Sequence, residues 1–421
     1  MSDAGGSRRF PRAEIFFFDG YIGIAASVVS AATALTEHGY DVHLYYNEPP
    51  LDVQIPHLPG ITLHRHVPWT RRFMGPVLER MRRRRLGKLG KIKADQTTRL
   101  QSAKLRSLVK AFIATVEVPQ FALFCRRQSR RPDLGIAFDM NSLAAMDYAI
   151  PRTVPFIYWS LEIIMKAEIR DPLLRSMKKH ELSRLSDAAA VVIQSPLRRD
   201  LLEQDRPRQP VRYVEVPNAP SEPLRPDIER DFYTTRFPVP TKARIVLQSG
   251  FISTSLLSQE IAESTRDWPP GFVLVFHERQ KRDPLEPYIR SVQEAGGART
   301  FLSLTPVPFD EVDKVYAGAH IGIVCYQIAD QNEETGWSSS GKLVFYLRHG
   351  LPIIVVTSKR PSLIAEWHCG IWVTKVEEIG AALAEIDADY AGYSARAKQA
   401  YDALFDFRKA FDRLLDTVKQ R

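Results

Sequence analysis

The stretch from Asn332 to Thr357 constrains the fold more than any other part of this chain. It predicts three elements in order: a polar loop over Asn332–Ser340, a short helix over Gly341–His349, and a strand over Ile353–Val356. Gly350 and Pro352 separate the helix from the strand, and these two residue types are typical of a helix C-terminus. A continuous β-branched run is typical of a parallel strand that is covered on both faces. The stretch therefore predicts an α/β domain with a parallel sheet.

The start of this predicted helix is a candidate anion site. Ser338, Ser339 and Ser340 precede it and are good N-cap residues. The backbone N–H groups of a first helical turn attract anions. Lys342 lies in the same turn, where its positive charge opposes the helix dipole. This placement favours a phosphate-binding lysine; the alternative is a surface lysine beside an ordinary serine cap.

Length and composition set the broad class. A chain of 421 residues with 44% hydrophobic residues predicts a globular protein of two domains. Its three cysteines lie far apart without metal-binding spacing, which favours buried thiols in the reduced cytoplasm and no bound metal. The polar, basic start does not resemble a secretory signal, and no apolar run is long enough to cross a membrane.

The net charge of +9 is unevenly distributed. Residues 1–220 contain 34 Lys and Arg against 22 Asp and Glu, a balance of +12, and residues 221–421 have a balance of −3. The first half is therefore expected to face an acidic partner.

The first half begins with a strand–helix–strand pattern. A strand over Glu14–Phe18 leads through a loop with Gly20 and Gly23 into a helix over Ala25–His38, and Val42–Tyr46 forms the next strand. Loops at this point of an open parallel sheet bind ligands. The alternative for the two glycines is a tight turn, and their spacing does not match a dinucleotide-binding fingerprint.

A basic helical insertion is predicted at about residues 70–118, after a third strand over Ile61–Val67. Arg71 to Lys93 contains ten Lys and Arg with Glu79 as the only acid. Phe73, Val77 and Met81 have helical spacing, and a second helix is expected to follow through Val116. Such a helix is typical of attachment to an anionic membrane surface. Nucleic acid and a solvated loop are the alternatives.

The rest of the first half continues the alternation. Strands are expected over Leu134–Phe138, Pro155–Trp159 and Ala188–Gln194, with helices after each and an extended segment over Val211–Val216. Asp139 and Glu162 follow two of these strands, where side chains point into the ligand crevice of a parallel sheet. The alternative for Asn141 or Ser142 is to cap the helix Leu143–Ile150. The proline-rich segment from Pro217 to Pro223 predicts the domain boundary.

The second half repeats this pattern from the strand Ile245–Gln248, which closes in Ser249–Gly250. Further strands are expected over Phe272–Phe276, Thr300–Leu302, Ile321–Cys325 and Gly370–Val373, with helices between them. A long helix over Ala391–Lys419 ends the chain, and we expect its end to return to the first domain. The sequence therefore predicts two doubly wound α/β domains, residues 1–220 and 221–421, facing across a cleft.

The motifs of the second half resemble the donor domain of GT-B glycosyltransferases, specifically the family-4-type retaining enzymes (glycosyl transferases group 1). The resemblance is carried by Val216–Asn218, Ser249–Gly250, Ala319–Val324 and, above all, Ser340-Gly341-Lys342 followed by Tyr346-Leu347 and Gly350-Leu351-Pro352. Phe138–Leu143 and Ser160–Glu162 resemble the acceptor-domain motifs of the same group.

This resemblance implies a nucleotide-sugar donor in the second domain and a saccharide or lipid-linked acceptor in the first. The donor-binding residues that it implies are Gly20, Gly23, Gly250, Ser339, Ser340, Gly341 and Lys342. It places Asp139 and Glu162 near the acceptor or the transferred sugar, as the candidate catalytic residues. The implied reaction is hexosyl transfer with retention and without a metal or other cofactor, because N–H groups and a lysine stabilise the leaving diphosphate.

The sequence departs from the family at three positions. The glutamate that binds the donor ribose is replaced by Phe345, and its partner seven residues earlier is Ser338. Glu333 or Glu334 is a candidate substitute for the missing carboxylates. The Arg/Lys pair that usually follows the glycine at 250 is also absent, so Arg279 or Lys281 is the candidate replacement.

Three functions remain open at this stage. The first is a glycosyltransferase of envelope polysaccharide or glycolipid synthesis, peripheral on the cytoplasmic face of the membrane through Arg71–Lys93. The second is a soluble glycosyltransferase of a small metabolite, and the third is a non-catalytic GT-B protein that binds nucleotide-sugars. Nucleic acid is not expected as a partner, because no recognisable reader motif accompanies the basic residues.

Overall fold

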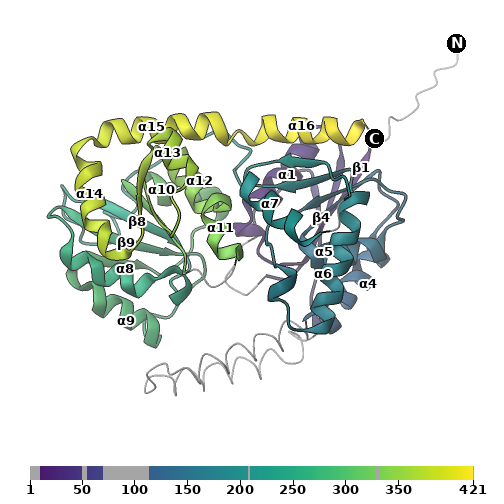
Figure 1. Cartoon of the computed structure of the whole chain (residues 1–421), viewed down its shortest axis with the longest axis horizontal. Helices are drawn as coiled ribbons and strands as arrows, with labels where there is room; N and C mark the ends of the chain where they lie inside the picture. The colour runs from purple at the N-terminus through teal and green to yellow at the C-terminus, as the bar shows by residue number, and fades with distance from the viewer. Residues whose placement is uncertain (1–9, 50–54, 70–112, 207–208, 328–330, 421) are drawn as a thin grey trace, which may run out of the picture.

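Two parallel sheets, one in each half of the chain, form the structure (Figure 1). The computed structural model describes residues 10–49, 55–69, 113–206, 209–327 and 331–420. The first sheet has the order β3-β2-β1-β4-β5-β6-β7 with all neighbours parallel. Its strands are β1 (Arg12–Phe17), β2 (Asp41–Asn47), β3 (Ile61–His66), β4 (Leu134–Phe138), β5 (Phe156–Trp159), β6 (Ala190–Ile193) and β7 (Tyr213–Glu215). Its helices are α1 (Ala26–Glu37), α4 (Val118–Gln128), α5 (Asp139–Ala149), α6 (Pro172–Arg184) and α7 (Pro196–Asp205).

The second sheet repeats the arrangement with the order β10-β9-β8-β11-β12-β13, again parallel throughout. Its strands are β8 (Arg244–Gly250), β9 (Phe272–Glu278), β10 (Thr300–Ser303), β11 (Ile321–Cys325), β12 (Ile353–Val356) and β13 (Gly370–Val373). The helices of this half are α8 (Ser258–Ser264), α9 (Pro287–Gly296), α10 (Val312–Ala317), α11 (Gln331–Ser339), α12 (Gly341–Arg348), α13 (Ser362–Trp367), α14 (Ile379–Ala388), α15 (Tyr390–Leu404) and α16 (Phe407–Lys419). Two doubly wound domains were predicted from the sequence, and this prediction is confirmed.

Each sheet has a point where the strand order reverses. The reversal lies between β1 and β4 in the first sheet and between β8 and β11 in the second. The loops that leave neighbouring strands diverge at such a point and open a crevice at the carboxyl edge of the sheet. Asp139 follows β4 and Gly250 ends β8, so both candidate sites begin at these crevices.

The helix α12 is fixed to the second sheet by Tyr346. The phenol donates a hydrogen bond to the Leu247 carbonyl and accepts one from the Ser249 amide, each 2.9 Å long. The ring fills the space above Gly322, where a Cβ would lie 2.3 Å from it. Gly350, with φ of +66°, ends the helix in the left-handed conformation, as the sequence predicts. These contacts of Tyr346 fix the position of α12 relative to β8 and β11.

The last two helices connect the domains. Figure 1 shows α15 and α16 end to end along one side of the molecule, α15 over the second domain and α16 over the first. Phe407, Phe411 and Leu414 of α16 are buried in the core of the first domain, near Trp159. A single helix over Ala391–Lys419 was predicted, and this is wrong because the chain breaks at Phe405–Asp406. Asp406 then caps α16 by accepting a hydrogen bond from the Lys409 amide.

The structure differs from the sequence analysis at three other places. The expected polar loop before α12 is the helix α11, which ends at Ser339. Neither Asn141 nor Ser142 caps α5, because this helix begins at Asp139, and the Ser142 hydroxyl instead accepts a hydrogen bond from the Phe18 amide. The helices α4 and α13 were not predicted, since Pro119 and the short length of α13 obscure the helical pattern.

Most of the predicted basic insertion lies outside the described residues, including the whole of Arg71–Lys93. Its described end, Ile113–Glu117, is a π-helical turn that leads directly into α4. No helix in the described ranges is long and apolar enough to cross a membrane.

Candidate functional site

Lys342 in the first turn of α12 is the most unusual charged residue of the second domain. Its side chain is 5% exposed, so the alternative of a surface lysine is excluded. Among the described residues its ammonium has no hydrogen-bond partner, and it lies 5.0 Å from the centroid of the Tyr326 ring. Burial, together with the charge of Arg279, lowers the pKa of Lys342 to about 7. A buried, unpartnered cation is costly, and an anionic ligand would supply the missing partner.

Gly250 leaves room for this lysine. It ends β8 with φ of +120°, a backbone conformation that residues other than glycine rarely adopt. A Cβ at this position would lie 3.4 Å from the Lys342 ammonium nitrogen. The backbone of Gly250 therefore borders the same space as the lysine, as predicted for a donor-binding residue at this loop.

Arg279 brings a second cation to this space. It follows β9, and a Cβ placed on Gly341 would lie 4.0 Å from its guanidinium. Arg279 also lowers the pKa of Lys342, so its guanidinium is close enough to act on the ammonium. Of the two candidate replacements predicted from the sequence, Arg279 after β9 is the one that lies near Lys342. Lys281, the other candidate replacement, is exposed. We call Gly250, Arg279, Gly341 and Lys342 the cationic cradle.

The three serines before α12 do not cap it. Ser340 occupies the N-cap position without a capping hydrogen bond, and its hydroxyl accepts one from Tyr326, 3.0 Å away. The Ser339 hydroxyl accepts a hydrogen bond from Arg198 at 3.2 Å, and the Ser338 hydroxyl lies 3.0 Å from that of Ser195. The prediction of serine caps is therefore wrong, because these side chains are used in contacts to Tyr326 and to the first domain. The N–H groups of the first turn are left without a serine cap.

The start of α1, which follows the glycine loop of the first domain, is linked to the α11–α12 junction through Asn218. Gly23 lies in the turn before α1, and Ser27 in the first turn of α1 donates a 2.8 Å hydrogen bond to Asn218. Asn218 in turn donates to the Ser339 carbonyl. Gly20 has a different reason to be glycine: a Cβ there would lie 2.7 Å from the Glu48 carbonyl oxygen. Its close approach is to the backbone at the end of β2 and just after it, within the first domain.

Asp139 holds the turn that follows β5 in the first domain. Its carboxylate accepts hydrogen bonds from the backbone amides of Leu161 at 2.7 Å and Glu162 at 2.9 Å. Its backbone has φ of +61°, which is uncommon for a residue other than glycine. Burial raises the pKa of Asp139 well above its usual value, although the two amides act in the opposite direction. Glu162 is exposed in the same turn, so the structure brings the two predicted carboxylates together.

Arg198 is a site residue that the sequence reasoning missed. It lies in the first turn of α7 and is 1% exposed. Its guanidinium donates to the Leu161 carbonyl at 2.6 Å as well as to Ser339. Nothing in the sequence distinguishes it from Arg199, its partly exposed neighbour, because its contacts come from distant segments.

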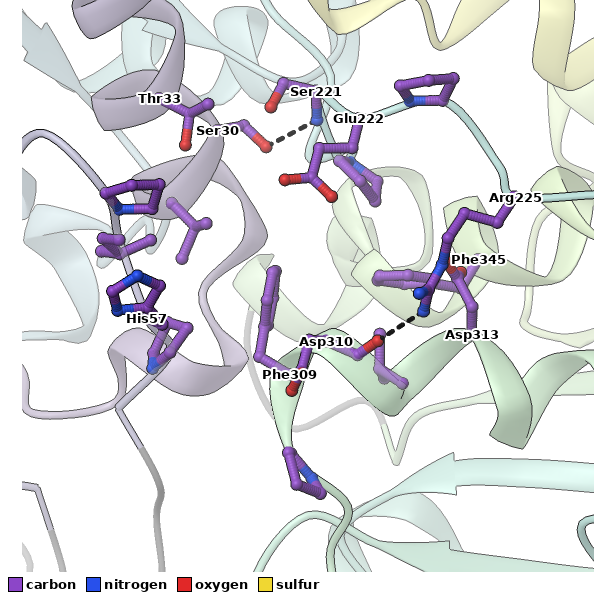
Figure 2. A pocket seen from close by; sticks show the side chains of 18 of the residues that line it. Ser30, Thr33, His57, Ser221, Glu222, Arg225, Phe309, Asp310, Asp313 and Phe345 are labelled. Carbon is purple, nitrogen blue, oxygen red and sulfur yellow. Dashed lines mark hydrogen bonds between the residues drawn. The ribbon is translucent and has the colours of Figure 1, made fainter. Parts of the chain in front are cut away.

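A cleft of about 630 Å³ runs between α1, the linker at 220–225 and the residues around Phe345. Figure 2 shows the rings of Phe309 and Phe345 and the carboxylate of Glu222 directed into this cleft. Phe345 is 6% exposed and stacks on Tyr316 with 4.8 Å between ring centroids. Phe345, which follows Lys342 by one helical turn in α12, is one of the residues that line this cleft. The side chains of Glu333 and Glu334 lie outside the described residues.

The described residues contain no cluster of three or more His, Cys, Asp or Glu side chains that would hold a metal ion.

Comparison with solved structures identifies the architecture. HepE from Anabaena, solved in complex with UDP and glucose, is 10% identical over 98% of this chain and 100% of its own, with a TM-score of 0.63. A glycosyltransferase from Rickettsia africae is 11% identical over 98% of each chain, with a TM-score of 0.62. WaaG, a glycosyltransferase involved in lipopolysaccharide biosynthesis, is 12% identical over 97% of this chain and 99% of its own, with a TM-score of 0.57.

This chain has the GT-B fold. The GT-B prediction from the sequence motifs is thus confirmed at the level of fold. Within the GT-B frame, residues 279–406 match the family described as glucosyltransferase 3-like, C-terminal domain. This matched segment includes Arg279, α11 and α12. No curated protein sequence matches the chain significantly.

Proposed function

We propose that this GT-B protein is a glycosyltransferase that moves a sugar from a nucleotide-sugar donor to a saccharide or lipid-linked acceptor. The observation that carries the proposal is the buried, unpartnered ammonium of Lys342 at the N-terminus of α12, with Arg279 beside it. A diphosphate fits this place because it accepts hydrogen bonds from the lysine and the first-turn N–H groups together. The match of residues 279–406 to a glucosyltransferase-like domain supports the same assignment.

The donor nucleoside lies in the cleft of Figure 2 in this proposal. The rings of Phe309 and Phe345 supply apolar contact area, and the exposed carboxylate of Glu222 is available to the ribose hydroxyls. This arrangement replaces the family carboxylate that is missing at position 345. UDP is the first nucleotide to test, because HepE was solved with UDP and with UDP-glucose.

The reaction proceeds with retention on one face of the donor sugar. The departing diphosphate develops negative charge, which Lys342, Arg279 and the α12 N–H groups stabilise without a metal. The leaving phosphate assists deprotonation of the acceptor hydroxyl. Asp139 and Glu162 act on the acceptor side, where Asp139 also holds the turn that carries Glu162.

The acceptor belongs to envelope polysaccharide or glycolipid synthesis, and the protein works peripherally on the cytoplasmic membrane face. The excess of basic residues in the first half supports attraction to anionic lipid. Co-sedimentation with anionic vesicles at low salt tests this step, with neutral vesicles as the control. Absence of binding to the anionic vesicles would favour a soluble glycosyltransferase of a small metabolite.

A panel of UDP, GDP, ADP, CMP and TDP and their common sugars, measured by thermal shift and calorimetry, tests the proposed function. We expect selective stabilisation by one nucleotide and loss of the effect in Lys342→Ala. No response to any nucleotide would contradict the donor site. A second candidate function, a non-catalytic nucleotide-sugar-binding protein, is favoured by Phe345 in place of the ribose-binding glutamate. Binding without donor hydrolysis or transfer would support that second function.

A further inference from the structure

Arg198 connects two parts of the site that belong to different domains. One arm of its guanidinium donates to the Leu161 carbonyl, in the turn that carries Glu162. The other arm donates to the Ser339 hydroxyl, one residue before the N-cap of α12. Leu161 belongs to the first domain and Ser339 to the second, and the arginine between them is almost completely buried.

The placement of Arg198 is unfavourable for α7 itself. A positive charge in the first turn opposes the helix dipole, and burial lowers the pKa of this guanidinium although Glu162 and Asp139 act in the opposite direction. Two hydrogen bonds of the guanidinium offset this cost to the helix. These bonds are made to the acceptor-side turn and the end of α11.

The Ser160–Glu162 turn is held from two directions. Asp139 accepts hydrogen bonds from its amides, and Arg198 donates to its Leu161 carbonyl. The α11–α12 junction is also held twice, because the Ser339 carbonyl accepts from Asn218 while its hydroxyl accepts from Arg198. Arg198 is the side chain that joins these two arrangements directly.

We propose that Arg198 is a positioning residue of the transfer reaction, which sets the acceptor-side turn in register with the first turn of α12 when the domains are closed. The inference rests on the proposed function. Its action runs through Leu161 and Ser339, and its planar fork is suited to two simultaneous partners. A lysine at this position would keep the charge but would not span both groups.

The kinetic test compares Arg198→Ala and Arg198→Lys with wild type, using the nucleotide selected by the panel, with UDP and UDP-glucose as the first probes. We expect kcat for donor turnover to fall about 100-fold in Arg198→Ala, the scale of a misaligned site, while the Kd for the nucleoside diphosphate changes less than about threefold. Guanidinium ion added to Arg198→Ala is expected to restore part of kcat. Arg198→Lys should remain impaired, and full activity of that variant would overturn the two-contact role.

Two control variants separate this role from general damage to the helix or the interface. Arg199→Ala removes the neighbouring arginine, which pairs with Asp200 and is 43% exposed, and should leave kcat unchanged. Ser195→Ala removes the other side-chain contact between α7 and α11 and should change kcat much less than Arg198→Ala. The double variant Arg198→Ala/Ser339→Ala should lose little more kcat than Arg198→Ala alone, because both substitutions remove the same Arg198–Ser339 hydrogen bond. Equal losses of kcat in the four single variants Arg198→Ala, Arg199→Ala, Ser195→Ala and Ser339→Ala would overturn the proposal.

A distance measurement tests the same contact without activity. The three native cysteines are buried, so spin labels on Lys179→Cys in α6 and Leu285→Cys in the second domain would report the interdomain distance. We expect Arg198→Ala to lengthen or broaden the distance distribution, and Arg199→Ala to leave it unchanged. An unchanged distribution in Arg198→Ala, with unchanged kcat, overturns the inference alone. Failure of wild type to bind any nucleotide overturns the proposed function and the positioning role together.

Discussion

The two domains have the same winding but differ in the ionisable side chains at the point where their strand order reverses. At the β1/β4 crevice the side chains are the carboxylates of Asp139 and Glu162, and Asp139 accepts two backbone hydrogen bonds. At the β8/β11 crevice they are the cations Arg279 and Lys342, and the Lys342 ammonium has no hydrogen-bond partner among the described residues.

The two crevices therefore differ in whether their buried ionisable group already has hydrogen-bond partners in the free protein. Asp139 in the first crevice already has protein hydrogen-bond partners, so the geometry of its turn is set in the free protein. The buried Lys342 ammonium in the second crevice has no hydrogen-bond partner among the described residues, which costs stability in the free protein that a bound anion would offset. Variants in the first crevice should therefore change turnover, and variants in the second should change donor affinity.

The largest effect is expected from Asp139→Asn. Asparagine keeps an oxygen that accepts from the Leu161 and Glu162 amides, so the turn is preserved while the ionisable group is lost. We expect kcat to fall about 100-fold or more, the usual range for a lost acid–base group, with little change in the Kd for nucleotide. Steady-state kinetics and calorimetry on the same variant check this. A loss of affinity as large as the loss of turnover would move Asp139 out of the acceptor side.

Lys342→Ala should show the reverse pattern. Loss of a charge-assisted contact to the diphosphate should weaken binding by about 1–3 kcal/mol, roughly 5- to 150-fold. Lys281→Ala is the matched control, because it removes an exposed lysine close in sequence to Arg279. Calorimetric titration with UDP measures both variants. Unchanged affinity in a folded Lys342→Ala protein would remove the lysine from the donor site.

The affinity for donor should also depend on pH through Lys342. Its pKa of about 7 in the free protein means that binding as an ammonium requires proton uptake above this pH. Affinity for UDP-glucose should be flat below about pH 7 and fall by up to about tenfold per unit above it, until the pKa of the complex is reached. Titrations in buffers of different ionisation enthalpy would detect the proton. The Lys342→Met variant should show neither effect, and a flat wild-type profile to about pH 9 would contradict the mechanism.

The same pKa shift has a consequence for folding. An unfolded lysine keeps its usual pKa near 10.5, so between about 7 and 10.5 the unfolded chain binds a proton that the folded protein does not. The contribution of Lys342 to the free energy of unfolding therefore rises with pH through this window. Lys342→Met should remove that part of the pH dependence in denaturant titrations.

The smallest effect is expected from Gly250→Ala. Positive φ makes alanine unfavourable both here and at Gly271, by about 1–2 kcal/mol of stability. Only at 250 would the new Cβ lie beside the Lys342 ammonium, whereas at 271 it meets nothing within 4 Å. We expect both variants to lose stability and Gly250→Ala alone to lose donor affinity. Equal affinities in the two variants would separate Gly250 from the cradle.

Local patterns in the sequence were sufficient where the information lies within one segment. The strand Leu134–Phe138, the start of α12 at Gly341 and its end at Gly350 are as predicted, because apolar periodicity and glycine signals act over a few residues. The same kind of pattern failed at α11, where the polar composition of residues 332–340 indicated a loop. Packing of α11 against α7 stabilises a helix that its own composition does not favour.

The candidate site was predicted only in part for the same reason. Asp139, Glu162, Arg279 and Lys342 were found from their positions after strands or at a helix start. Their states were not predictable: that Lys342 is buried and that Asp139 holds the Glu162 turn depend on contacts between distant segments.

The sequence by itself determined two doubly wound α/β domains and a helix start suited to phosphate, since alternation, glycines and a first-turn lysine are local features. Only the tertiary structure decided which charged groups have partners. Arg198 and Ser339 are 141 positions apart, and they meet because the two domains close on each other. Burial and pairing set the pKa values and the register of the site, and both are properties of the assembled chain.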